Sequence, residues 1–318
     1  MKASQDRPAR AARMAAVAAA SVISILAVMP GVANASPHNP PTPDKPCGVS
    51  QKDASTKYDH VVFILMENKP LASVEGSPDA PYMNKLAGLC GTGHNDHGTT
   101  HPSLPNYIKL TSGSDQGITD DSNPSAHPLN VDSIFSQLNG DWRGLDESMK
   151  TNCEQQNDGH YAVRHNPAAY YVKDNFPAVC QQKDIPFALG AHTTPDLSAK
   201  FTFITPDTCD DMHDDCAGTG TSGELQTGDN YLSTLIPALI NTKEYQAENT
   251  AIFITFDEGA GTNNSVFTEV IAPTVVPGTK ANDPFTDYSL LRTAEDELRL
   301  PPLGAAATAT SMRDAFSI

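Results

Sequence analysis

Three short, largely apolar runs recur along the chain, His60–Met66, Phe201–Thr205 and Ala251–Phe256. Apolar runs of this length predict central parallel strands that are covered on both faces. Helical or irregular stretches separate them, among them Val131–Leu138 and Asn230–Ile240. The pattern therefore predicts one α/β domain with a doubly wound, mostly parallel central sheet and helices on both faces.

Each apolar run stops at polar side chains. Glu67-Asn68 follow the first run, Asp207 follows the second, and Asp257-Glu258 follow the third. Ligands of open α/β sheets bind at the carboxyl ends of the strands, so this placement favours a site there. Polar residues that merely lead a strand into a loop are the ordinary alternative.

The stretch from Thr100 to Gly113 has the features of a short helix. Ser103 is a suitable N-cap, Pro105 falls in the first turn, and Gly113 suits a left-handed C-cap. A serine placed there lies among free backbone N–H groups at the positive end of the helix dipole, which can hold an oxyanion or a phosphate. A capped helix without any chemistry would have the same pattern.

The N-terminus has the features of a secretory signal peptide, predicted over residues 1–35. Four basic residues precede the apolar run Met14–Met29, and Ala33-Asn34-Ala35 follows it. Residues 36–57 are predicted to be a proline-rich, poorly packed leader, with order beginning at Tyr58 and a single domain over 58–318. No later stretch is apolar enough to predict stable membrane insertion, so we expect a secreted protein.

Charge and cysteine content agree with export. The formal net charge of the 318 residues is −17 at pH 7, which argues against nucleic acid or an anionic membrane surface as the main partner. An anionic substrate would then need local divalent cations. The even number of cysteines favours disulfides over a zinc site, and proximity along the chain favours the pairs Cys209–Cys216, Cys153–Cys180 and Cys47–Cys90.

Several segments resemble one known family. Ser103-Leu-Pro-Asn-Tyr followed by Leu-Thr-Ser-Gly113 resembles the nucleophile segment of the alkaline phosphatase superfamily. The chain is most similar to the phosphoesterase family of bacterial and fungal acid phosphatases and bacterial phospholipases C, from about Tyr58 to Phe316. The resemblance implies an alkaline-phosphatase-like fold, a small-molecule phosphoester substrate and a phosphoserine intermediate.

The resemblance also implies roles for individual residues. Carboxylate, amide and hydroxyl oxygens suit a divalent metal ion, and the implied ligands of a first ion are Glu67, Asn68, Ser103, Asp257 and Glu258. Asp207 and Asp211 are implied for a second metal or for leaving-group binding, and Asn106 and Arg164 for substrate binding. His165 and His213 are implied as catalytic residues beside the nucleophile Ser103. The acidic run between Cys209 and Cys216 that holds His213 could instead be a solvated disulfide loop.

One position departs from the family pattern. Asp287 stands where relatives commonly have a histidine before Tyr-Ser. An aspartate there would favour a harder metal ion, so the resemblance leaves the second metal site open.

A secreted, metal-dependent acid phosphatase that hydrolyses phosphomonoesters is the expected function. A phospholipase C-type phosphodiesterase is the alternative from the same site. A metal-free serine esterase would want a Gly-x-Ser-x-Gly elbow, which is not found here. A non-catalytic exported binding protein would want aromatic platforms, and Trp142 is the only tryptophan.

Overall fold

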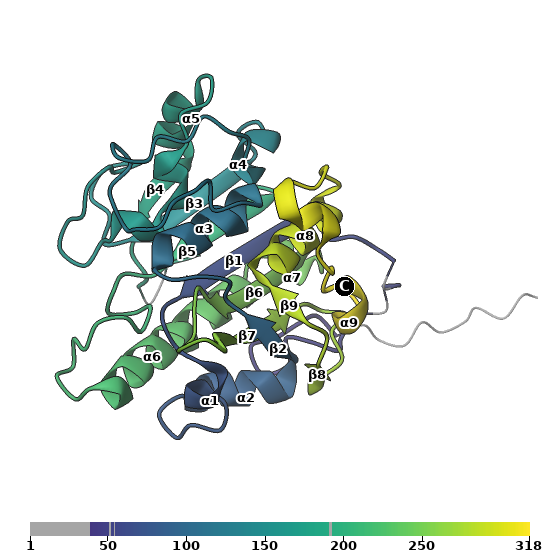
Figure 1. The fold of residues 1–318 in the computed structure, drawn as a ribbon. Coiled ribbons are helices and arrows are strands. Elements are labelled where there is room, and N and C mark those ends of the chain that lie inside the picture. Colours follow the sequence, from purple (N-terminus) through teal and green to yellow (C-terminus); the bar gives the residue numbers. More distant parts are fainter. Residues whose placement is uncertain (1–38, 51, 54, 191–192) are drawn as a thin grey trace, which may run out of the picture. The chain divides into compact units, whose positions relative to one another are not determined.

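A mixed β-sheet forms the centre of the computed structural model, which describes residues 39–50, 52–53, 55–190 and 193–318 (Figure 1). The described residues from Asn39 to Ile318 form one unit, and the predicted signal peptide lies outside them. Nine strands of the described chain join in the order β4-β3-β5-β1-β6-β7-β2-β8, with β9 paired to β2. Their bounds are β1 His60–Met66, β2 Gly91–His97, β3 Trp142–Glu147, β4 Asp184–Phe187, β5 Phe201–Thr205, β6 Thr250–Phe256, β7 Ser265–Ile271, β8 Thr279–Ala281 and β9 Phe285–Thr286.

The central strands run parallel. Val61 of β1 is in register with Phe201 of β5 on one side and with Ala251 of β6 on the other. β7 is antiparallel to both β6 and β2. Every residue of β6 is buried, as expected of a strand covered on both faces. The predicted α/β fold with a mostly parallel sheet is confirmed.

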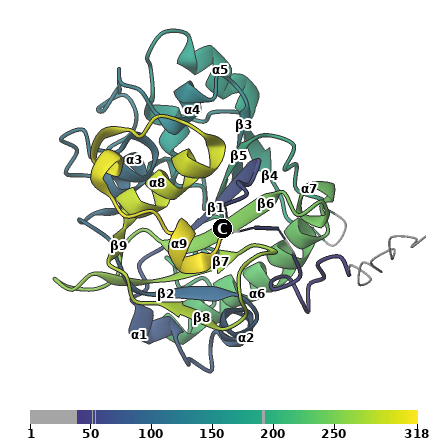
Figure 2. The same ribbon diagram turned by 90° about the vertical axis from the view of Figure 1, so that its right-hand side faces the viewer.

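Helices cover both faces of this sheet. Figure 2 shows α3 and α8 on one side of the central strands and α6 and α7 on the other. The α-helices are α1 Leu71–Val74, α2 Pro81–Leu89, α3 Ser103–Ser112, α4 Ile134–Gln137, α5 Phe176–Lys183, α6 Thr221–Ile240, α7 Lys243–Gln246, α8 Asp287–Leu298 and α9 Arg313–Phe316. Short 3-10 turns cover Val163–His165, Pro167–Tyr170 and Gly304–Thr308. None of the helices in the described ranges combines the length and apolar character needed to cross a bilayer.

The two helical stretches expected from the sequence differ in length. The stretch at Asn230–Ile240 is the second half of a longer helix, α6, whereas the stretch at Val131–Leu138 contains only the single turn α4. Ser133 and Ser136 cap α4 reciprocally. The positive φ angles of Asn139 and Gly140 then turn the chain into β3, so the helix cannot continue.

The segment before Tyr58 is better packed than its composition predicts. Cys47 is fully buried and forms a disulfide with Cys90. The Tyr245 hydroxyl donates a hydrogen bond of 3.0 Å to the Pro46 carbonyl. The prediction of a poorly packed leader is therefore wrong for residues 39–50, because a disulfide and side-chain contacts hold a proline-rich chain against the domain.

The cysteine pairing is as predicted. Disulfides join Cys47 to Cys90, Cys153 to Cys180, and Cys209 to Cys216. No free cysteine remains among the described residues.

Candidate active site

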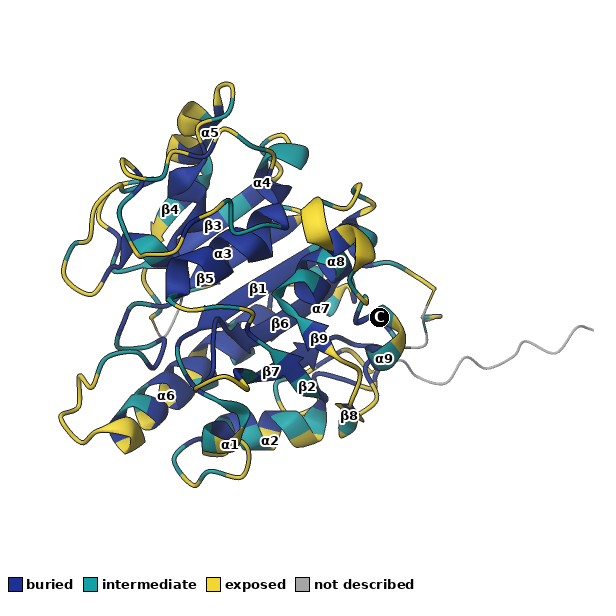
Figure 3. Ribbon diagram, in the orientation of Figure 1, coloured by how far each residue is buried: buried dark blue, intermediate teal, exposed yellow. Residues whose placement is uncertain are grey.

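Helix α3 places Ser103 at the carboxyl ends of the central strands. All ten residues of α3 are buried, which Figure 3 shows as a dark helix beside the sheet. Gly113 ends the helix with φ 74°, as expected of a left-handed C-cap. The prediction that Ser103 caps the helix is wrong, because the extended residue Pro102 takes the N-cap position and Ser103 is the first helical residue. Its hydroxyl is therefore available for a contact with another element.

That contact is with Glu67, directly after β1. The Ser103 hydroxyl donates a hydrogen bond of 3.0 Å to Glu67 Oε2. Asn68 Nδ2 donates to the same oxygen at 2.6 Å, and the Tyr107 hydroxyl donates to Oε1 at 2.8 Å. Glu67 is fully buried, so these three donors hold its carboxylate in one orientation.

Asp257 lies beside Glu67 because β1 and β6 are adjacent and in register, with Met66 opposite Phe256. The backbone N–H of Asn68 donates to Asp257 Oδ1 at 3.1 Å. Asp257 Oδ2 is buried and has no hydrogen-bond partner among the described residues. Parallel pairing alone thus brings two strand-end carboxylates next to one serine.

Glu258 approaches the same helix from the next position. Its Oε2 accepts a hydrogen bond of 3.2 Å from Asn106 Nδ2, and its Oε1 lies 2.9 Å from Nδ1 of His101. Asn106 Nδ2 also donates to the Thr100 carbonyl at 3.0 Å. Asn106, expected to bind substrate, therefore has a carboxylate and a carbonyl as partners for its amide nitrogen.

His165 lies between two of the carboxylates. Its Nε2 is 3.0 Å from Glu67 Oε1, and its Nδ1 is 3.2 Å from Asp211 Oδ2. The ring stacks on Tyr107 with centroids 5.1 Å apart and an interplanar angle of 6°. Burial lowers the pKa of His165 well below its usual value, and the ring spans the distance between Glu67 and Asp211.

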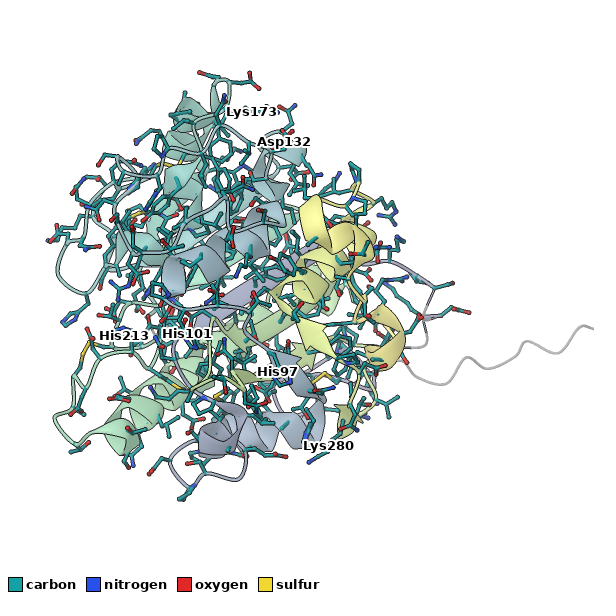
Figure 4. The ribbon with its side chains drawn as sticks, in the orientation of Figure 1. His97, His101, Asp132, Lys173, His213 and Lys280 are labelled. Atoms are coloured by element: carbon teal, nitrogen blue, oxygen red, sulfur yellow. A yellow bond between two sulfur atoms is a disulfide. The ribbon has the colours of Figure 1, made fainter. Side chains whose placement is uncertain are left out.

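Arg164 and His213 form a more open edge of the site, where His101 and His213 are both labelled in Figure 4. Arg164 Nη2 lies 3.4 Å from His213 Nε2, and His213 Nδ1 lies 2.8 Å from Asp214 Oδ1. Among the described residues Arg164 forms no ion pair with a carboxylate. Its guanidinium is therefore available to an anionic ligand.

The buried carboxylates lack the positive charge that would balance them. Burial, followed by the charges of Asp257 and Asp211, raises the pKa of Glu67 well above its usual value. Burial and the charge of Glu258 raise the pKa of Asp257 to about 8. Within the described ranges, no lysine or arginine forms an ion pair with any of these groups. Buried charges in proteins are normally paired or coordinate a metal, and these oxygen donors fit a divalent cation.

Two residues expected at a metal have other partners. Asp287 Oδ2 accepts hydrogen bonds from the hydroxyl of Thr99 at 2.7 Å and from its backbone N–H at 3.2 Å. Asp207 Oδ2 accepts one from the Ser148 hydroxyl at 2.6 Å. Asp207 belongs to a separate acidic group with Glu147 and Asp210.

Three residues of the site were not predicted from the sequence. Tyr107 contacts Glu67 and His165, and His101 contacts Glu258. Asp121 Oδ1 accepts a hydrogen bond of 2.9 Å from the Leu104 backbone N–H. The expectation of free N–H groups at the start of α3 is therefore wrong for Leu104. Tyr107 could have been predicted, since it lies four residues after Ser103 and residues four apart share one face of a helix. Asp121 lies in a polar loop, and no sequence pattern points to it.

Comparison with known proteins identifies the family. The model of the Phosphoesterase family matches residues 76–301, more than half of the chain. A phosphatidylinositol-3-phosphatase of Mycobacterium tuberculosis is 29% identical over 267 residues, which cover 81% of this chain and 82% of that protein. A probable acid phosphatase of Kluyveromyces lactis is 26% identical over 225 residues, covering 64% of this chain and 50% of that protein.

Solved structures agree on the fold. A protein of the alkaline phosphatase superfamily from Vibrio parahaemolyticus has a TM-score of 0.56 at 10% identity, over 83% of this chain and 73% of that one. The lipoteichoic acid synthase LtaP of Listeria monocytogenes has a TM-score of 0.55 at 12% identity, over 82% and 77%. The chain thus has an alkaline-phosphatase-superfamily fold, belongs to the Phosphoesterase family and is a hydrolase that acts on phosphoric ester bonds.

Proposed function

We propose that the chain is a metal-dependent phosphomonoesterase of the acid phosphatase type, which works through a phosphoserine on Ser103. The observation that carries the proposal is the 3.0 Å contact between the Ser103 hydroxyl and Glu67 at the first turn of α3. The contact supports the proposal because the Ser103 hydroxyl lies beside carboxylates that have no lysine or arginine partner in the described chain.

Glu67, Asn68, Asp257 and Glu258 are the residues that would hold a divalent cation beside Ser103. Such an ion supplies a Lewis acid that polarises a phosphoryl oxygen and lowers the pKa of the attacking hydroxyl. The buried Asp257 Oδ2, which has no partner in the described structure, supports this assignment.

Ser103 attacks the phosphorus while its proton passes to Glu67 Oε2, which accepts its hydrogen bond, and the bond from phosphorus to the ester oxygen breaks. Arg164, which has no carboxylate partner among the described residues, binds the equatorial phosphoryl oxygens. Asp214 holds Nδ1 of His213, and Nε2 faces Arg164 at the open edge of the site. In its doubly protonated form His213 delivers the Nε2 proton to the departing alcohol. Water then attacks the phosphoserine. His165 does not contact substrate in this scheme; it positions Glu67 and Asp211.

A phosphomonoester is the preferred substrate because both curated relatives carry the names of phosphatases. The Mycobacterium tuberculosis relative, which matches this chain over 82% of its own length, is named a phosphatidylinositol-3-phosphatase. A phosphoinositide, whose 3-phosphate is a monoester, is therefore the second candidate. Three disulfides suit an oxidising compartment, which supports secretion.

The test uses chelator-treated protein with single metals restored, against three substrates: p-nitrophenyl phosphate, a short-chain phosphatidylinositol 3-phosphate and bis(p-nitrophenyl) phosphate. We expect activity to disappear when the metal is removed. When a metal is restored, activity should return with the two monoester substrates. Faster hydrolysis of the diester would instead favour the phospholipase C alternative. Undiminished activity after complete metal removal would contradict the proposal.

A further inference from the structure

A second group of carboxylates lies at the ends of β3 and β5. Glu147 ends β3, while Asp207 and Asp210 lie in the turn after β5. The two strands are parallel neighbours, with Asp146 opposite Thr205. One oxygen from each of the three carboxylates lies within 4.8 Å of the others.

Backbone contacts fix this arrangement. The backbone N–H of Asp207 donates to Glu147 Oε2 at 3.2 Å. Asp207 Oδ1 accepts from the N–H of Cys209 at 3.0 Å and from that of Asp210 at 3.2 Å. The three carboxylates therefore come together through the fold of the turn and not through an exposed surface cluster.

No ion pair among the described residues balances the charge of this group. In the described chain, no lysine, arginine or histidine forms an ion pair with Glu147, Asp207 or Asp210. The three side chains are only partly exposed. Carboxylates crowded in this way repel one another unless protons or a cation intervene.

Tyr231 provides an independent sign of a ligand. This residue of α6 is 6% exposed, and its hydroxyl is buried with no hydrogen-bond partner in the described structure. With Glu147 and Asp210 it lines an open cavity of about 510 Å³. Buried tyrosine hydroxyls normally have a partner, so this one faces a place where a ligand or its water belongs.

We propose that Glu147, Asp207 and Asp210 bind a calcium ion, with the Tyr231 hydroxyl donating to a ligand oxygen or to an ion-bound water. Calcium takes six to eight oxygen ligands in flexible geometry. Three carboxylates on one side and a cavity that admits water on the other meet that requirement.

The ion would brace the turn that supplies Asp211. Asp211 donates its N–H to the Asp207 carbonyl at 2.8 Å, and its own carbonyl accepts the N–H of Glu67 at 2.8 Å. The calcium site is therefore separate from the Ser103 site but shares one turn with it. Its role is structural support, and it does not depend on the reaction proposed for Ser103.

Calcium chloride titration of the metal-free full chain tests the proposal. We compare the wild type with Asp210→Asn, Glu147→Gln and Asp257→Asn, and with Asp132→Asn, a surface aspartate paired with Lys173, as the matched control. We expect Asp210→Asn and Glu147→Gln each to bind one calcium fewer and to lose calcium-dependent stabilisation against heat. Asp132→Asn should keep both, and Asp257→Asn, which affects only the site beside Ser103, should keep the calcium that Asp210→Asn and Glu147→Gln lose.

The metal-free variants provide the second readout. Removing one repelling charge should leave metal-free Asp210→Asn and Glu147→Gln at least as stable as the metal-free wild type, so lost calcium binding cannot be ascribed to misfolding. Terbium emission excited through tyrosine should fall in Tyr231→Phe while Ser103 variants retain it. Equal calcium stoichiometry in the wild type, Asp210→Asn and Glu147→Gln would overturn the site.

Discussion

The hydroxyl of Ser103 donates a hydrogen bond of 3.0 Å to Glu67 Oε2 across 36 positions of the chain. It joins the first turn of α3 to the carboxyl end of β1. The contact is possible because Pro102, and not Ser103, takes the N-cap position. A hydroxyl that does not cap its own helix is free to serve as a nucleophile.

Ser103→Ala tests that role. We expect turnover to fall by a factor of about 10⁴ or more, because the covalent route is lost. The free energy of unfolding should fall by only about 1 kcal/mol, the usual contribution of one hydrogen bond. Ser112→Ala is the matched control, since Ser112 is buried at the other end of α3 and bonds the Ile108 carbonyl at 2.9 Å. Phosphatase activity in Ser103→Ala near that of Ser112→Ala would contradict the assignment.

Glu67→Gln and Asp257→Asn test the metal site. Each replaces an anionic oxygen by a neutral one, so metal affinity should fall at least about tenfold, the scale of a supporting ligand's loss. The metal-free variants should be more stable than the metal-free wild type at neutral pH, because the raised pKa values of Glu67 and Asp257 mean that folding must take up protons there, whereas an amide needs none. Glu269→Gln serves as the control, since Glu269 is an equally buried carboxylate on β7. Calorimetric titration would exclude these ligands if both variants bound metal as the wild type does.

Asp287 is expected to behave differently from these ligands. Both of its hydrogen bonds go to Thr99, and it is the first residue of α8. We expect Asp287→Asn to retain the metal content of the wild type, measured by elemental analysis, whereas Asp287→Ala should lower the thermal stability by releasing the Thr99 loop. Loss of metal from Asp287→Asn alone would restore Asp287 to the ligand set.

The sequence predicted the parts of this molecule that depend on local pattern. The bounds of β1 and β5 match the apolar runs, because a strand covered on both faces must be apolar throughout its length. The acidic residues that follow these runs could be placed at one edge of the sheet, because ligand sites of open α/β sheets lie at the carboxyl ends of the parallel strands.

Features that depend on tertiary contacts could not be predicted in this way. The packing of residues 39–50 depends on contacts such as that of the Tyr245 hydroxyl with the Pro46 carbonyl, and the pairing of Leu104 with Asp121 depends on the course of a polar loop. Asp207 and Asp211 stand close together in one acidic run, yet they face different carboxylate groups. Only the fold of the turn between them separates the two.

Glu295 should make stability depend on pH. Burial raises its pKa to about 8, although Oε1 accepts a hydrogen bond of 2.7 Å from the Leu303 N–H. Between its unfolded pKa, near 4.5, and its folded pKa, only the folded state holds the proton, so stability falls as pH rises through this range. Glu295→Gln retains an acceptor for Leu303 and carries no charge. Denaturant unfolding should show the stability of the variant rising by roughly 3 kcal/mol relative to that of the wild type from pH 5 to pH 8; parallel pH profiles would contradict this.

The proposed phosphoserine route predicts the stereochemistry at phosphorus. Attack by its hydroxyl must come in line with the departing alcohol, and the first displacement inverts the phosphorus while forming a phosphoserine. Water enters from the side that the alcohol has left, so the second displacement inverts it again. A chiral, isotopically labelled phosphomonoester should therefore give product of retained configuration, and a rapid acid quench should show phosphate on Ser103. Net inversion would mean that water attacks the substrate directly, and Ser103 would then only bind the metal or orient the ester.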